Sequence, residues 1–183
     1  MLNWIEKELA FANEQREEVP WLFMLMHNPV YCSPNWRLPL VKRTGGPRYS
    51  HDCAFDVLVM QNMLEGMMNR YKVDVVFQAH VHRYERNTAI YRNETVPCDY
   101  EDFHIYQNAN APIYVTTGNA GNDEGYKETT PTPNKYVVYQ HKDFCYGILT
   151  VHNKTHIYYE QYNVEDDTMM DWWWVSKNRT TYN

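Results

Sequence analysis

Residues 73–82 of this 183-residue chain read Val-Asp-Val-Val-Phe-Gln-Ala-His-Val-His, and this stretch decides the fold that we predict. The short apolar run from Val73 to Phe77 is typical of a buried strand. His80 and His82 follow it almost at once. Because α/β sheets bind their ligands at the carboxyl ends of their strands, both histidines are well placed for chemistry.

The same arrangement occurs upstream. Six apolar residues, 21–26, show no alternation and predict a strand that is covered on both faces. His27 ends this run, and residues 55–71 between the two strands have apolar residues at helical spacing. If the two strands are parallel neighbours, all three histidines meet at one edge of a sheet. The alternative is a structural role, because a His-x-His pair arises readily by chance in a chain with eight histidines.

The flanking regions extend this pattern. Apolar residues at spacings of three and four predict an amphipathic helix from Leu2 to Gln15. Four prolines and a Gly-Gly pair predict a long irregular loop over residues 28–53. β-Branched and aromatic residues predict strands at 113–118, 136–139, 145–151 and 156–162. The tail carries Trp172-Trp-Trp174, which either packs on the sheets or forms a patch for a partner, and we favour packing.

Composition excludes several classes of protein. The chain has 17 basic and 23 acidic residues and a net charge of −6, which argues against a nucleic-acid-binding face. No apolar run approaches the roughly 20 residues of a membrane span, so we expect no membrane contact. The first ten residues contain acids and a lysine where a signal peptide would have its apolar core, so no signal peptide is expected here.

Cysteines and glycosylation sequons bear on the compartment. Cys32, Cys53, Cys98 and Cys145 show no Cys-x-x-Cys spacing, which leaves either disulfides or buried thiols. Three sequons begin at Asn93, Asn153 and Asn178 and lean toward the secretory route.

Two histidine-bearing blocks carry a family resemblance. Residues 24–33 read Met-Leu-Met-His-Asn-Pro-Val-Tyr-Cys-Ser, and residues 71–86 include Gln-Ala-His-Val-His-Arg-Tyr-Glu-Arg. In these blocks the sequence resembles the purple acid phosphatases of the calcineurin-like metallophosphoesterase superfamily, because the first looks like the VxxH block of that family and the second like its GHxH block. The segment at 111–122 is similar to the next strand and turn of the family, and the segment at 146–157 to its terminal hairpin.

This resemblance implies a fold and a division of the chain. The fold would be α/β, the C-terminal half of an α/β/β/α metallophosphoesterase sandwich with βα units followed by a mostly antiparallel β region. Residues 1–183 would be a partial catalytic domain, with histidine motifs in 1–90, a β-rich region in 91–165 and a tail in 166–183.

The resemblance also implies a binuclear metal centre of Fe(III) with Zn, Mn or Fe(II). His27 and His80 would be ligands of the exchangeable divalent ion, and His82 a ligand of the ferric ion. His51 and Asp52 would contact the phosphate or the leaving group. Tyr84 and Glu85 would lie next to the ligands without binding the metal, and Glu85 would orient a histidine ring, since metal-bound histidines usually donate to a second group.

Animal-type members have a similar Cys-Ser…Asp-Cys loop, so the resemblance also implies a disulfide between Cys32 and Cys53. The expected location is secreted, lysosomal or vacuolar.

The sequence departs from the family in two ways. Ala79 replaces the glycine of GHxH, and Trp36 and Arg37 stand where plant members have two histidines. More importantly, the GDxxY and GNHE/D motifs are missing, and the only Asp-x-Gly, at Asp123, comes after the GHxH block.

The residues support two hypotheses. The first is acid-phosphatase-type hydrolysis of phosphomonoesters, with this chain carrying the C-terminal ligand set. The second is a catalytically incomplete fragment that acts as a binding or complementing partner, with the missing N-terminal half as one candidate to complete it.

Overall fold

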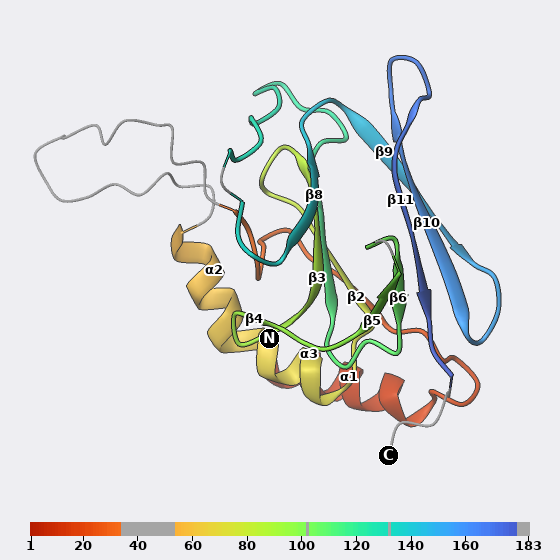
Figure 1. The fold of residues 1–183 in the computed structure, drawn as a ribbon. Helices are drawn as coiled ribbons and strands as arrows, with labels where there is room; N and C mark the ends of the chain where they lie inside the picture. The colour runs from red at the N-terminus through yellow and green to blue at the C-terminus, as the bar shows by residue number, and fades with distance from the viewer. Residues whose placement is uncertain (34–53, 102, 132, 179–183) are drawn as a thin grey trace, which may run out of the picture.

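The computed structural model describes residues 1–33, 54–101, 103–131 and 133–178 and contains two packed β-sheets (Figure 1). The helices are α1 (Leu2–Glu14), α2 (Ala54–Met60) and α3 (Gly66–Arg70), and the π-helical turn η1 (Gln61–Glu65) joins α2 to α3. The two helices predicted from apolar spacing, at 2–15 and 55–71, are therefore confirmed. The strands are β1 (Phe23–Leu25), β2 (Val75–Gln78), β3 (Tyr84–Tyr91), β4 (Glu94–Thr95), β5 (Asp99–Glu101), β6 (Ile105–Gln107), β7 (Ile113–Thr117), β8 (Val137–His141), β9 (Cys145–Val151), β10 (His156–Asn163) and β11 (Met169–Ser176).

The six-stranded sheet contains both histidine-bearing strands. Its order is β1-β2-β7-β3-β4, and β8 also pairs with β3. Strands β1, β2 and β7 are parallel, with Phe23 opposite Val75 and Val75 opposite Ile113. The predicted parallel pairing of the two apolar runs is thus confirmed, and it brings their carboxyl ends to the same edge of the sheet.

One prediction about β1 is wrong. Its six-residue apolar run was expected to be covered on both faces, but β1 is an edge strand and Leu25 is 76% exposed. The described part of the chain supplies a neighbouring strand on one side of β1 only. The apolar character of the run was therefore not sufficient to predict its burial.

The five-stranded sheet has the order β5-β6-β11-β10-β9. It is antiparallel except for the parallel pair β6 and β11. Strand β11 lies at its centre, although the sequence predicted only a tail over residues 166–183. Trp173 is fully buried between the sheets, while Trp172 and Trp174 lie on the outer face and stack on His104 and Tyr158, with ring centroids 4.2 and 4.5 Å apart.

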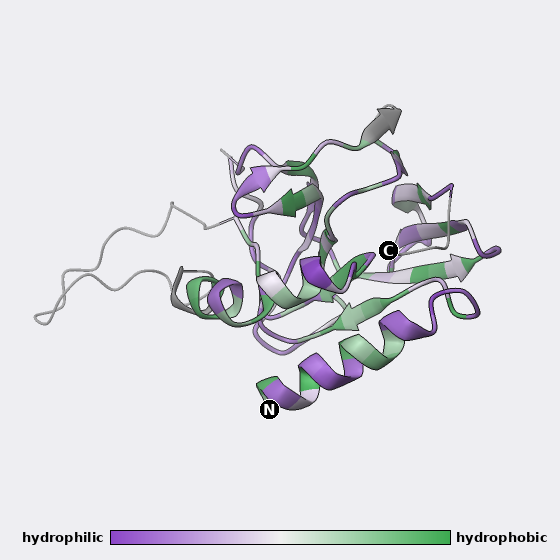
Figure 2. Ribbon diagram, turned by 90° about the horizontal axis from the view of Figure 1, so that it is seen from below, coloured by the Kyte–Doolittle hydropathy of each residue, from purple (hydrophilic) through white to green (hydrophobic). Residues whose placement is uncertain are grey.

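The pleat of the strands divides the core into two parts. Val75 faces the second sheet and belongs to the cluster that includes Tyr159 and Trp173. Its neighbour Val76 points to the other side and packs with Leu9 and Met68 of the helices. Successive side chains of a strand point to opposite faces, so β2 is buried from both sides. Figure 2 shows α1 lying alongside the hydrophobic strands of this sheet.

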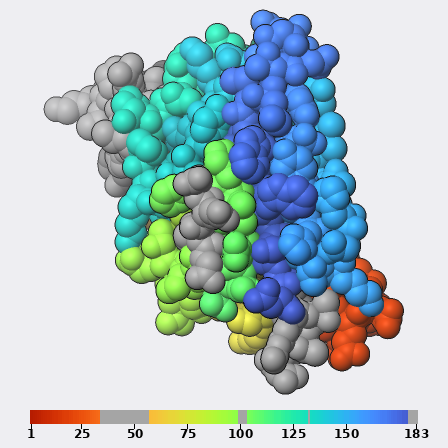
Figure 3. Space-filling model, turned by 45° about the vertical axis from the view of Figure 1, so that its right-hand side comes forward, coloured from red at the N-terminus to blue at the C-terminus, as the bar shows by residue number. Residues whose placement is uncertain are grey.

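The mixed α/β class is confirmed. Every helix in the described ranges packs on the six-stranded sheet, so the described residues form helix, sheet and sheet layers of the α/β/β/α sandwich whose C-terminal half was expected. The surface of β9, β10 and β11 forms one side of the molecule, drawn in blue in Figure 3. None of the described helices is both long and apolar enough to cross a membrane.

Candidate metal centre

Two of the predicted histidines meet at the carboxyl edge of the six-stranded sheet. His27 follows β1 and His80 follows β2, and the Nε2 atom of His27 lies 3.2 Å from the Nδ1 atom of His80. Their rings are nearly perpendicular, at 74°, with centroids 5.2 Å apart. Both side chains are accessible to solvent, so the pair can be reached by an ion or a substrate.

Backbone geometry holds this pair in place. The Ala79 amide donates to the His27 carbonyl at 3.0 Å, which continues the strand pairing beyond β2. His80 has a φ of 64°, in the left-handed region that few non-glycine residues adopt. Such strained residues cluster at functional sites, where the surrounding structure fixes them.

Gly118 lets β7 approach the histidine loop closely. A Cβ atom at Gly118 would overlap with the backbone carbonyl of Val81, between the two histidines of the loop. A glycine is therefore required at this position by packing rather than by its φ angle. The sequence pattern alone did not single it out.

His82 faces a different environment. Its Nδ1 atom lies 3.1 Å from the Gly125 carbonyl oxygen, and Glu124 places a carboxylate oxygen 3.9 Å from the same nitrogen. A carbonyl can only accept, so this contact assigns the proton to Nδ1 and leaves the Nε2 lone pair free to act as an acceptor or ligand. Metal-binding histidines are commonly oriented by such a contact.

The spacing of the His27 and His80 nitrogens fits two ligands of one transition-metal ion, but the described side chains do not complete such a site. Two nitrogen ligands of one tetrahedral zinc, each at 2.0–2.1 Å, lie roughly 3.3 Å apart, close to the 3.2 Å between His27 and His80. Within the described ranges, however, no group of three or more His, Cys, Asp or Glu side chains is arranged to hold one ion. Among the described residues, His27 and His80 therefore supply two candidate ligands, and His82 does not join them in a single ligand set.

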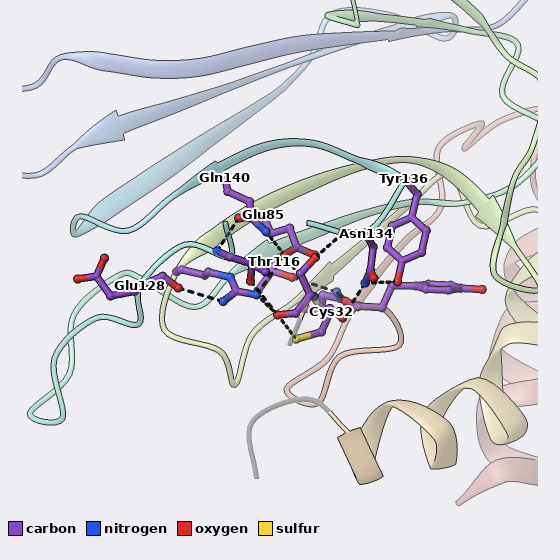
Figure 4. A network of polar contacts seen from close by, with 12 residues as sticks. Cys32, Glu85, Thr116, Glu128, Asn134, Tyr136 and Gln140 are labelled. Atoms are coloured by element: carbon purple, nitrogen blue, oxygen red, sulfur yellow. Dashed lines mark hydrogen bonds and ion pairs between the residues drawn. The ribbon is translucent and has the colours of Figure 1, made fainter. Parts of the chain in front are cut away.

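The segment after His27 is anchored by a buried polar network, drawn in Figure 4. Glu85 accepts hydrogen bonds from Gln140 at 2.7 Å, from Arg83 at 3.2 Å and from the Ser33 amide at 3.3 Å. Arg83 also donates to the Ser33 carbonyl, and Asn134 donates to the Cys32 carbonyl at 3.2 Å. Arg83 and Glu85 are each about 1% exposed, so this ion pair is fully desolvated.

This network revises the roles predicted for Tyr84 and Glu85. Glu85 contacts the chain beside the histidine pair, whereas the prediction had it orient a histidine ring. Tyr84 points to the opposite face of β3, where its hydroxyl donates to Asp171 at 2.8 Å in the second sheet. Adjacent residues of a strand face opposite ways, so the two could not both support the same ligand.

Several predicted residues lie outside the described ranges. His51 and Asp52 fall in the segment 34–53, as do Trp36 and Arg37. Cys32 is disulfide-bonded, while its predicted partner Cys53 belongs to the same segment.

The other cysteines and the sequons are described. Cys98 and Cys145 are free thiols. Asn93, Asn153 and Asn178 are all exposed, as glycosylation requires.

One further residue of the site is Gln78. It is 1% exposed, lies two residues before His80 and hydrogen-bonds the chain that follows His27. A polar side chain at the end of an apolar strand is the signal that could have found it, because such groups are buried only when they are paired.

Comparison with known proteins relates this chain to a family. Residues 111–172 match the family model described as iron/zinc purple acid phosphatase-like protein C. The chain is 34% identical over 161 residues to Fe(3+)-Zn(2+) purple acid phosphatase 12 of Arabidopsis thaliana, covering 85% of this chain and 29% of that protein. It is 32% identical over 171 residues to acid phosphatase type 7 of Danio rerio, covering 90% of this chain and 36% of the relative.

A solved structure agrees. A purple acid phosphatase from yellow lupin (Lupinus luteus) seeds superposes with a TM-score of 0.71 at 27% identity, over 96% of this chain and 28% of the lupin chain. The chain spans about a third of the length of the curated relatives it matches, or somewhat less. Sequence and fold together identify it as a relative of the purple acid phosphatases, similar to the C-terminal portion of those enzymes.

Proposed function

We propose that this chain contributes His27, His80 and His82 to a binuclear metal centre that hydrolyses phosphomonoesters. The observation that carries the proposal is the His27–His80 pair, whose facing nitrogens lie 3.2 Å apart at the ends of two parallel strands. The related proteins are named as purple acid phosphatases and support phosphoester hydrolysis as the reaction class.

The residues of this chain have distinct tasks in that reaction. Fe(III) with Zn, Mn or Fe(II), when bound, would polarise the phosphoryl group and activate water for attack. His27 and His80 would hold the divalent ion, and His82 the ferric ion, each through a neutral ring nitrogen. The Gly125 carbonyl would keep the His82 proton on Nδ1, so that Nε2 stays available.

His51 and Asp52 complete the proposal from outside the described ranges. A histidine at this place in the loop would contact the phosphate or protonate the leaving alkoxide, and the neighbouring aspartate would assist it. Phosphomonoesters at acidic pH are the proposed substrates, because a protonated histidine is a competent general acid there.

Further ligands must come from elsewhere, since a two-metal site needs a bridging carboxylate besides imidazole. The sequence has no GDxxY or GNHE/D motif, and the described side chains supply no third ligand to the His27–His80 pair. We propose that a polypeptide equivalent to the N-terminal half of the relatives supplies these carboxylates.

A second candidate function, a binding or complementing partner without its own turnover, is favoured by the edge strand β1. Leu22 and Met26 form backbone hydrogen bonds toward β2, so the intervening Phe23 and Leu25 direct their backbone groups away from the sheet. Beside them lies a cavity of about 330 Å³ that Phe77 and Leu149 also line. A strand edge that no described strand pairs, next to an apolar cavity, is suited to an added strand.

The proposed location is secreted, lysosomal or vacuolar. The disulfide at Cys32 supports an oxidising compartment, and the three sequon asparagines are exposed. Secretion from a eukaryotic host should give a protein whose mass falls on endoglycosidase treatment. Substituting Gln for Asn153, which lies in the exposed β9–β10 turn, should remove one glycan.

Metal content and turnover test the catalytic proposal. The purified chain is loaded with ferric iron and zinc and assayed with a chromogenic aryl phosphate in mildly acidic buffer. His82→Ala and His27→Ala are compared with His156→Ala, an exposed histidine on β10. Two metals and turnover lost only in the first two variants would mean that this chain is catalytically sufficient.

Substoichiometric metal without turnover would instead favour the complementing role, provided that His27→Ala removes the metal. Metal uptake that is equal in all three variants and the unmodified protein would refute the proposed site.

A further inference from the structure

Gln78 makes an unusual set of contacts for a residue inside a strand. Its Oε1 atom accepts a hydrogen bond from the Val30 amide at 2.9 Å, and its Nε2 atom donates to the Tyr31 carbonyl. Nε2 also donates to the Thr116 hydroxyl at 3.0 Å. The carboxamide therefore pairs with backbone groups of two consecutive residues, Val30 and Tyr31, which belong to no strand.

These contacts tie together three parts of the sheet edge. Gln78 ends β2, Thr116 belongs to β7, and Val30 lies three residues after His27. Gln78 and Thr116 are each 1% exposed, while Val30 and Tyr31 are fully buried. Buried hydrogen bonds of this kind are not exchanged with water, so they fix their partners more firmly than surface contacts do.

The Gln78 carboxamide lies near both histidines: it is close in sequence to His80 and close in space to the backbone that follows His27. His80 is two residues after Gln78, and the Val30–Tyr31 backbone is anchored just beyond His27. The distance between the two imidazoles therefore depends on the Gln78 side chain as well as on the Ala79–His27 backbone bond.

We propose that Gln78 is a positioning residue that sets the separation and orientation of His27 and His80. It does not touch the ion or the substrate and acts only through the two histidines. The inference rests on the proposed function for its importance to metal binding, although the geometric part can be tested without metal.

The test replaces Gln78 by methionine, which keeps the volume and removes all three hydrogen bonds. Thr116→Val removes only the contact to β7 and should act in the same direction with a smaller effect. Tyr106→Phe is the matched control, because Tyr106 of β6 is fully buried and its hydroxyl bonds Asn87 and Arg86 of β3.

Two measurements are made on each variant. Proton NMR of histidine-labelled, metal-free protein reports contacts between the His27 and His80 rings, whose centroids lie 5.2 Å apart. Calorimetric titration with zinc chloride reports affinity. Loss of an orienting contact behind a metal ligand typically weakens metal binding about 10- to 100-fold, and we expect this for Gln78→Met.

The outcomes are distinct. Loss of the ring contacts and weaker zinc binding in Gln78→Met, with both retained in Tyr106→Phe, supports the inference. Unchanged ring contacts and zinc affinity in Gln78→Met overturn it. If the unmodified protein binds no zinc but Gln78→Met still loses the ring contacts, metal binding by this chain alone fails and the positioning role stands.

Discussion

Replacing Asp171 with alanine should destabilise the protein strongly, because this residue joins the two sheets. Asp171 lies in β11 and receives two hydrogen bonds from Arg86 of β3, at 2.7 and 2.9 Å. The Tyr84 hydroxyl donates a third at 2.8 Å. The side chains of Asp171 and Arg86 are each 1% exposed, so solvent cannot replace the lost partner.

The magnitude comes from leaving Arg86 buried without its counter-charge. Breaking a buried ion pair in this way costs about 3–5 kcal/mol, which is a large part of the roughly 5–15 kcal/mol that stabilises a typical domain. For a chain of this size each kcal/mol lowers the melting temperature by about 2–4 °C, so Asp171→Ala should melt roughly 6–20 °C lower. Arg86 keeps its hydrogen bonds to the Phe103 carbonyl and the Tyr106 hydroxyl, but neither of these acceptor groups carries a charge.

Urea unfolding and calorimetry measure this loss. Glu165→Ala, an exposed carboxylate in the β10–β11 turn, is the control and should change stability by less than about 0.5 kcal/mol. High salt should leave the Asp171→Ala loss intact, because buried pairs are screened little. The double variant Arg86→Met with Asp171→Leu should recover part of the loss, since an apolar pair removes the orphaned charge. A loss below about 1 kcal/mol in Asp171→Ala would refute the claim that this pair is buried and formed.

Other substitutions test separate features. Gly118→Ala should cost about 1–3 kcal/mol by overpacking and should weaken zinc binding, whereas Gly66→Ala, in open space on α3, should stabilise by about 0.5–1 kcal/mol; thermal melts of both variants decide. Burial lowers the pKa of Lys177 from 10.5 to about 8, so between these values the folded protein binds fewer protons than the unfolded chain and stability from this group rises with pH. Unfolding at pH 8 and pH 10 should show that rise in the natural protein and lose it in Lys177→Met; equal pH dependence would contradict it. Burial raises the pKa of Cys145 to about 11, so iodoacetamide at pH 8 should label the half-buried Cys98 first, and mass spectrometry identifies the site.

Much of the fold could be predicted because its signals are local. Helical spacing located α1 and the 54–70 helix within a residue or two, and the strands β7, β9 and β10 lie where aromatic and β-branched runs predicted them. Strand β11 was missed because its Trp-Trp-Trp run has no polar alternation, although buried and half-buried residues alternate along it. The edge position of β1 could not be inferred either, since burial depends on neighbours that the strand itself does not encode.

The site was predictable in part for the same reason. The positions of His27 and His80 could be inferred from strand ends in a parallel sheet, an argument that needs only two apolar runs and a helix between them. The role of Glu85 could not be predicted from the sequence. Whether its side chain faces Ser33 and Gln140 or a histidine depends on the register of β3 against β8. A shift of one residue would exchange the environments of Glu85 and Tyr84.

Polar residues within or beside apolar strands are the most informative signal that the sequence held. Gln78 ends the apolar run of β2, and Asp171 stands directly before the tryptophans of β11. Both are buried and hydrogen-bonded, as the cost of burying an unpaired polar group requires. Their role as anchors can therefore be inferred from sequence, but their partners cannot, because Val30 lies 48 residues from Gln78 and Arg86 lies 85 from Asp171. Only the structure shows these long-range pairings. The one between Gln78 and Val30 anchors the backbone beside the candidate metal site.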